Sequence, residues 1–154
     1  MRIYRFVNPA LWLLLTLATG TAYAGEHVYT ATDPAWKTEC GSCHVAYPPQ
    51  LLPAASWRKL MTGLNNHFGT DASLDAKTAE SIARFLETNS STKRKYANDS
   101  ALRITESRWF RKEHDEVPAR TWKNPTIKSA ANCTACHTRA EQGDYSERTL
   151  RVPR

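Results

Sequence analysis

The hydrophobic residues of this chain recur at helical spacing rather than in alternation. Trp57, Leu60, Met61 and Leu64 form a stripe at positions i, i+3, i+4 and i+7, and Ser56 before them is a residue type that caps helices. A second stripe follows Asp75 and consists of Ala79, Ile82, Ala83 and Leu86. Alternating strand patterns are scarce, so the sequence predicts an all-α fold.

Capping residues place further helices. Asp33-Pro34 fits the N-cap and first position of a helix from Ala35 to Cys43. Ser129 is expected to cap a helix that ends before Gly143. The predicted helices cover residues 35–43, 57–64, 76–89, 107–116 and 129–141.

The first 24 residues have the pattern of a secretory signal peptide. A short, positively charged start precedes a largely apolar run over residues 6–20, and Ala22-Tyr23-Ala24 forms a small-x-small cleavage site. We therefore expect cleavage before Gly25 and a periplasmic protein. The alternative is an uncleaved membrane anchor, but a span needs roughly 20 apolar residues, and this run is shorter and contains Asn8-Pro9.

The net charge of the chain excludes few classes of function. Loss of Arg2 and Arg5 with the first segment lowers the formal net charge from +6 to +4. The basic balance is a weak indication of acidic partners and no indication of nucleic acid. The single basic run, Lys93-Arg94-Lys95, fits a solvated linker.

The four cysteines form two C-x-x-C pairs, and each pair is followed at once by a histidine. In an exported chain such pairs are also compatible with disulfides or a zinc site. With 5 histidines in 154 residues, a histidine would follow a given pair by chance about 3% of the time. C-x-x-C-H is the motif of c-type haem attachment, in which two thiols bind the haem and the histidine binds iron. The sequence thus predicts two covalently bound haem c groups, attached at Cys40, Cys43, Cys133 and Cys136, with His44 and His137 on the irons.

The occupant of the second axial position of each iron distinguishes an electron carrier from a haem enzyme. A second protein ligand closes the iron, whereas an open iron binds oxygen or peroxide. After cleavage the remaining candidates are Met61, His27, His67 and His114. Met61 belongs to a core stripe, and His27 lies near the new terminus, where chains are usually mobile. His67 follows His44 by 23 residues, and His114 precedes His137 by 23 residues. We therefore expect the pairs His44/His67 and His114/His137, with cross-assignment between halves as the alternative.

The chain divides into two haem-centred halves with long loops. We expect an N-terminal haem domain at residues 25–90 and a C-terminal haem domain at residues 91–154, joined through the polar segment 89–100. The tail 144–154 is expected to lie extended along the surface. Each half has roughly 65 residues, a size at which a protein core alone is marginal, so the haems should form much of each core.

Four segments are more specific than the attachment motif alone. They are CGSCHVAYPPQLLP (40–53), the segment 56–69 that begins with SW and ends with HFG, WFRKEHDEVP (109–118) and ANCTACH (131–137). Over nearly the whole mature chain they resemble the small dihaem cytochrome c family, often called DHC. The resemblance implies an all-α periplasmic electron carrier with two low-spin haems, whose axial ligands fall on His44, His67, His114 and His137. It also implies partners: a membrane b-type cytochrome and a soluble high-spin monohaem cytochrome of the SHP type.

Three rival functions share the haem motifs. The nearest is a small dihaem electron-transfer subunit of a periplasmic reductase such as nitrate reductase. A haem peroxidase and a gas-binding haem protein belong to a different class, because both need one open iron. Two further histidines match two irons, so we expect an electron carrier and no enzyme.

Overall fold

The computed structural model describes residues 27–97 and 99–153, and this part of the chain consists of short helices and long loops without a β-strand. The expected signal peptide, residues 1–24, lies outside the described residues. Within the described ranges, no helix has the length and hydropathy needed to cross a membrane. The all-α prediction is confirmed.

Three helices build the first half of the chain: α1 (Pro34–Cys40), α2 (Ala54–Met61) and α3 (Ala76–Thr88). The N-cap of α1 is as predicted, and α3 has an N-cap of the same kind. The carboxylate of Asp33 accepts a hydrogen bond of 2.8 Å from the backbone nitrogen of Trp36, with Pro34 at the first helical position. Asp75 likewise accepts from the backbone of Thr78 at 3.0 Å. These bonds satisfy amide groups that a helix start would otherwise leave unpaired.

Two helix boundaries differ from the prediction. Helix α1 ends at Cys40, so Cys43 lies in the turn after it instead of in the helix. Helix α2 begins at Ala54 after Pro53, and Ser56 is a buried residue of its first turn, not its cap. Pro53 is extended, and the helix begins directly after it, three residues before the first apolar residue of the stripe.

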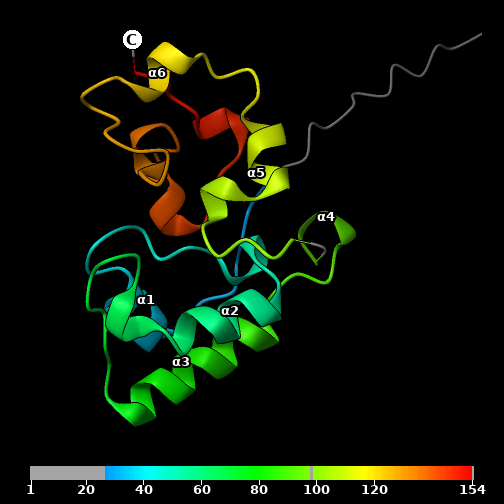
Figure 1. Ribbon diagram of the computed structural model, residues 1–154. Helices are drawn as coiled ribbons and strands as arrows, with labels where there is room; N and C mark the ends of the chain where they lie inside the picture. Colours follow the sequence, from blue (N-terminus) through cyan, green and yellow to red (C-terminus); the bar gives the residue numbers. More distant parts are fainter. Residues whose placement is uncertain (1–26, 98, 154) are drawn as a thin grey trace, which may run out of the picture.

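The core of the protein lies where α1 and α2 pack against α3 (Figure 1). Ile82 and Leu86 of α3 are almost fully buried, as their stripe predicted. Around them pack the other buried members of the cluster: Trp36, Leu51, Leu52, Trp57, Ile104 and Phe110. Because Ile104 and Phe110 come from the second half, one apolar cluster joins both halves.

The second half contains α4 (Arg94–Ala97), α5 (Arg108–Glu113) and α6 (Ala119–Trp122). The predicted helical segment 107–116 corresponds to α5. Ser107, at its start, caps the helix, because its hydroxyl oxygen accepts a hydrogen bond of 3.2 Å from the backbone nitrogen of Phe110. The helix ends at Glu113 instead of near residue 116. The segment 89–100 was expected to be a linker, but it carries α4 and the buried ring of Tyr96.

The long helix expected at residues 129–141 does not form. Only single 3-10 turns are present there, Cys133–Ala135 and Ala140–Gln142, and Ser129 bonds the backbone of Ala131 instead of capping a helix. Lys128 has a positive φ of 64°, which turns the chain sharply just before this segment. Gly143 ends the second turn in the left-handed conformation, and this stop was predicted correctly.

The two ends of the described chain meet in the second half. The backbone nitrogen of Tyr29 donates to the carbonyl oxygen of Gly143 at 2.8 Å, and the nitrogen of Tyr145 donates to the carbonyl oxygen of His27 at 2.8 Å. The C-terminal tail also differs from the extended surface segment expected. It forms the turn Glu147–Thr149, and Arg151 donates from its backbone to the carbonyl oxygen of Cys136 at 2.8 Å.

Candidate functional site

The structure brings His44 and His67 together beside the α1–α3 core. Their ring centroids are 6.4 Å apart, and their planes differ by 28°. His44 lies in the loop after α1, where its Nδ1 is 2.8 Å from the carbonyl oxygen of Val45. The ring of Tyr47 stacks on it at 4.6 Å and 22°. The backbone and the Tyr47 ring thus set the orientation of the His44 imidazole.

His67 is held by a tight turn that follows α2. Its backbone nitrogen donates to the carbonyl oxygen of Thr70 at 2.7 Å, and the nitrogen of Thr70 donates back at 3.2 Å. The two residues between them, Phe68 and Gly69, have φ values of 54° and 98°. Positive φ at both central positions is the requirement of a type I′ turn. The reversal leaves the His67 side chain facing His44.

A second histidine pair lies in the other half of the molecule. The ring centroids of His114 and His137 are 6.2 Å apart, with planes at 78°. His114 follows α5, stacks on Phe110 at 4.0 Å and 20°, and has its Nδ1 2.9 Å from the Phe110 carbonyl oxygen. His137 follows the turn of the second cysteine pair and forms an isolated bridge with Leu150 of the tail.

The ring separation in both pairs matches the distance that a shared metal ion requires. Two imidazole rings on opposite sides of one metal, each bound at about 2.0 Å, have centroids roughly 6 Å apart. A carbonyl oxygen facing Nδ1 places the ring proton on that nitrogen, for His44 and His114, and leaves Nε2 free to bind a metal. The structure thus joins the residues that the 23-residue spacing paired, and their role as axial ligands stays a prediction.

Burial favours the neutral form of one histidine in each pair. It lowers the pKa of His67, with His44 as the next cause, and it lowers the pKa of His137, with His114 as the next cause. A neutral imidazole is the form that binds a metal. The Nδ1 atoms of His67 and His137 are buried and have no hydrogen-bond partner within the described chain.

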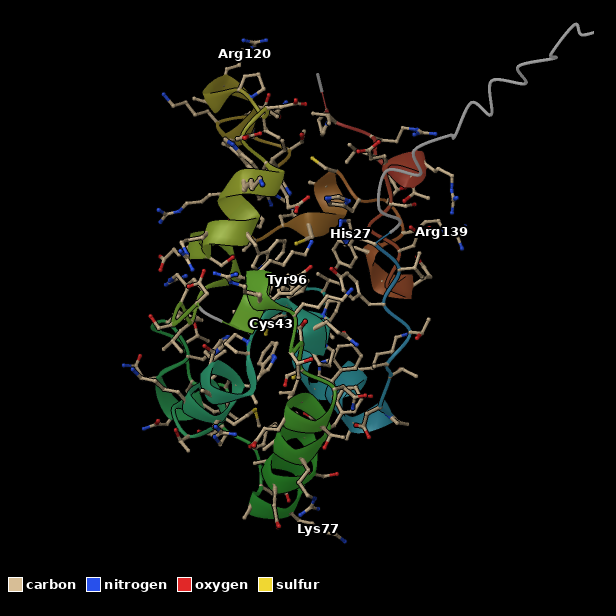
Figure 2. All side chains as sticks on the ribbon, turned by 90° about the vertical axis from the view of Figure 1, so that its right-hand side faces the viewer. His27, Cys43, Lys77, Tyr96, Arg120 and Arg139 are labelled. Carbon is tan, nitrogen blue, oxygen red and sulfur yellow. The ribbon has the colours of Figure 1, made fainter. Side chains whose placement is uncertain are left out.

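None of the four motif cysteines, all of which lie within the described residues, forms a disulfide. The disulfide alternative is therefore not what the structure shows, and the four sulfur atoms are available for thioether bonds. Cys43 is exposed. It lies between the part built by α1, α2 and α3 and the C-terminal segments (Figure 2).

A cavity of about 510 Å³ connects the first cysteine pair with the first histidine pair. Cys40, Cys43, His44 and His67 all line it, and Trp36, Leu52, Trp57 and Leu86 contribute apolar walls. The volume falls in the range of cofactor pockets, roughly 300–1,000 Å³. An apolar cavity with two thiols and two imidazoles on its wall has the donor set that a covalently attached haem requires, so the residues present fit the group.

The remaining ligand candidates have distinct places. Met61 lines the same cavity as His67. His27 is beside the second half (Figure 2), where its Nε2 lies 4.0 Å from a carboxylate oxygen of Glu113. We expected a mobile terminus at His27, whereas its carbonyl oxygen is tied to Tyr145.

Sequence reasoning missed the tyrosines around the two sites. Tyr47 joins the sites, because its ring stacks on His44 and its hydroxyl donates to the carbonyl oxygen of Ala131 at 2.7 Å. Tyr145 lies 5.2 Å from the ring of His137. Burial chiefly raises the pKa of both phenols, so they stay neutral. Tyr47 stands three residues after His44 in the segment 40–53, and that proximity was the available signal.

This chain is similar to one protein family and to several solved structures. Residues 36–145 match the dihaem cytochrome c family, DHC, and no curated protein matches. Among solved structures, a diheme cytochrome c from Rhodobacter sphaeroides is 43% identical, covers 76% of this chain and 99% of its own, and has a TM-score of 0.68. A diheme cytochrome type c from Shewanella baltica OS155 is 39% identical, covers 78% of this chain and 92% of its own, and has a TM-score of 0.69.

This chain belongs to the dihaem cytochrome c family. Its cofactors are two covalently attached haem c groups, each with an iron. The prediction made from the two C-x-x-C-H motifs is thereby confirmed for the class of protein and for its cofactors.

Proposed function

We propose that this protein is an exported electron carrier in which two histidines close each haem iron. His44 and His67 would bind the first iron, and His114 and His137 the second. The observation that carries the proposal is the pair of ring separations, 6.4 Å and 6.2 Å, each close to what a single metal between two imidazoles requires.

The residues of this chain would hold the haems and leave them no free coordination site. When bound, each haem supplies an iron that accepts and returns one electron. The thiols of each motif anchor one edge of the ring, so the cofactor cannot diffuse away from an exported protein. The stacked rings of Tyr47 on His44 and of Phe110 on His114 keep the imidazoles in place. A fixed ligand set reduces the rearrangement that accompanies each electron transfer.

The proposed partners follow from the family resemblance. The carrier would take electrons from a membrane b-type cytochrome and pass them to a soluble high-spin monohaem cytochrome of the SHP type. Its proposed location is the periplasm, after removal of residues 1–24. The supports for export are the signal-like pattern of those residues and the c-type attachment motifs.

Spectroscopy of the purified holoprotein tests the proposal. We expect EPR and optical spectra with two low-spin ferric haems, and no carbon monoxide adduct after reduction at neutral pH. An iron with an open position would bind carbon monoxide rapidly and give a high-spin signal. Such a result at either haem would contradict the carrier function and favour the peroxidase or gas-binding alternative.

A further inference from the structure

Arg103 is the single positively charged side chain among the described residues that line the first cavity. Haem c brings two carboxylates, which project from the edge of the ring opposite the thioether bonds. A carboxylate that leaves water without a hydrogen-bonded partner is strongly unfavourable. A cationic or strongly donating group on the wall away from the cysteines would stabilise such a carboxylate.

The other charged residues of the cavity are acidic. Glu39 precedes Cys40, so it lies on the side where the ring is attached. Asp71 accepts a hydrogen bond of 2.9 Å from the backbone of Ser73. Both would repel a haem carboxylate. Arg103 is the charged group that would attract it.

The guanidinium of Arg103 is held in place by two contacts. It lies 4.0 Å from the centroid of the Phe68 ring, a cation–π distance. Its Nε is 3.6 Å from a carboxylate oxygen of Glu106.

Phe68 occupies a conformation that bulky residues rarely adopt. Its φ of 54° belongs to the type I′ turn, whose central positions favour Asn and Gly. The ring is 42% exposed, so burial alone does not explain a phenylalanine there. The turn instead sets the ring between His67, at a centroid distance of 4.8 Å, and Arg103. Strained residues of this kind cluster at functional sites.

We propose that Arg103 binds a carboxylate of the first haem and that Phe68 is the positioning residue that holds the guanidinium at the cavity. The proposal rests on the proposed function only in taking His44 and His67 as the ligands of that haem. A fixed positive charge beside the haem stabilises the reduced form, which carries one electron more. Arg103 should therefore raise the reduction potential of the first haem and leave that of the second unchanged.

Redox titration of the holoprotein, followed by EPR, tests this inference. The signal of the first haem is identified beforehand as the low-spin signal that His67→Ala removes. We expect Arg103→Gln to lower the potential of that haem, equivalent to about a tenfold weaker electron affinity. Arg103→Lys should retain most of the affinity, and Phe68→Leu should give a smaller loss. The matched control is Arg84→Gln, because Arg84 is an exposed arginine of α3 paired with Glu80.

Infrared difference spectra between the oxidised and reduced protein separate contact from a distant charge effect. The carboxylate band of the first haem should shift in Arg103→Gln and stay in place in Arg84→Gln. The inference is overturned if Arg103→Gln and Arg84→Gln change the potential equally, or if the potential falls while the carboxylate band does not move. If the unmodified protein has no low-spin signal from the first haem, the assignment of His44 and His67 as its ligands is contradicted instead. Failure of this inference and failure of the proposed function are therefore distinguishable.

Discussion

The hydroxyl of Tyr47 donates a hydrogen bond of 2.7 Å to the carbonyl oxygen of Ala131, a residue 84 positions further along the chain. The same tyrosine stacks on His44 of the first site, and Ala131 stands two residues before Cys133 of the second. Cys133 also lines the first cavity. The Tyr47 side chain thus links the segment that carries His44 to the segment that carries Cys133.

Tyr47→Phe should destabilise the protein, because the Ala131 carbonyl loses its donor while the ring stack is kept. We expect a loss of about 1 kcal/mol in the free energy of unfolding, measured by denaturant titration of the holoprotein. Tyr145→Phe is the matched control, since the buried Tyr145 hydroxyl has no hydrogen-bond partner within the described chain. Equal losses in both variants would show that the Tyr47 bond contributes nothing specific.

His114→Ala should open the second iron alone. The variant is expected to show one high-spin haem that binds carbon monoxide, while the first haem stays low-spin. His27→Ala serves as the control, because His27 packs beside the second half, where its ring lies near Glu113, whereas His114 stacks on Phe110. Optical and EPR spectra of both variants decide the matter. Two low-spin haems in His114→Ala would assign the ligand elsewhere.

Met61→Leu tests the rival ligand of the first haem. Met61 lines the cavity, and it is also one of the partly buried hydrophobic residues that pack against the core. A nearly volume-conserving exchange should cost less than about 1.5 kcal/mol and leave the potentials unchanged. Histidine–methionine ligation raises haem potentials. A large fall in one potential on this substitution would therefore identify Met61 as a ligand and displace His67.

The double substitution Cys133→Ala and Cys136→Ala should remove the second haem and disorder the C-terminal half. That half has only short helices and 3-10 turns, and its core would lose the cofactor that completes it. Hydrogen exchange should show protection in α1, α2 and α3 and little protection after α5. Cooperative protection throughout the C-terminal half would contradict the view that the haem forms its core.

Gly143→Ala should destabilise the junction between the two ends of the chain. A Cβ at this position would collide with the carbonyl oxygen of Tyr29, and the backbone is left-handed, with a φ of 77°. Gly69→Ala is the control, because Gly69 also has positive φ, at 98°, but a Cβ there meets nothing within 4 Å. We expect about 1 kcal/mol for Gly69→Ala from the backbone alone and a clearly larger loss for Gly143→Ala in thermal unfolding.

Local signals predicted those parts of the fold whose causes are local. The caps Asp33 and Asp75 and the stripe of α3 act through residues three or four positions apart, so they can be identified in the sequence. The expected helix at residues 129–141 failed because the backbone turns sharply at Lys128, and the segment is held by contacts with the tail and with Tyr47. Contacts between residues that are far apart along the chain leave no periodic pattern in the sequence.

The sequence by itself determined the class of this protein, because covalent attachment of a haem requires two cysteines and a histidine at one short, recognisable spacing. It also narrowed the candidates for the second axial ligand of each iron to three histidines and one methionine, because the mature chain has no others outside the attachment motifs. Only the tertiary structure decided which histidines face each other, how Tyr47 joins the two sites, and that Arg103 reaches the first cavity over Phe68. These relationships depend on how the chain folds back on itself, and sequence separation does not determine distance in space.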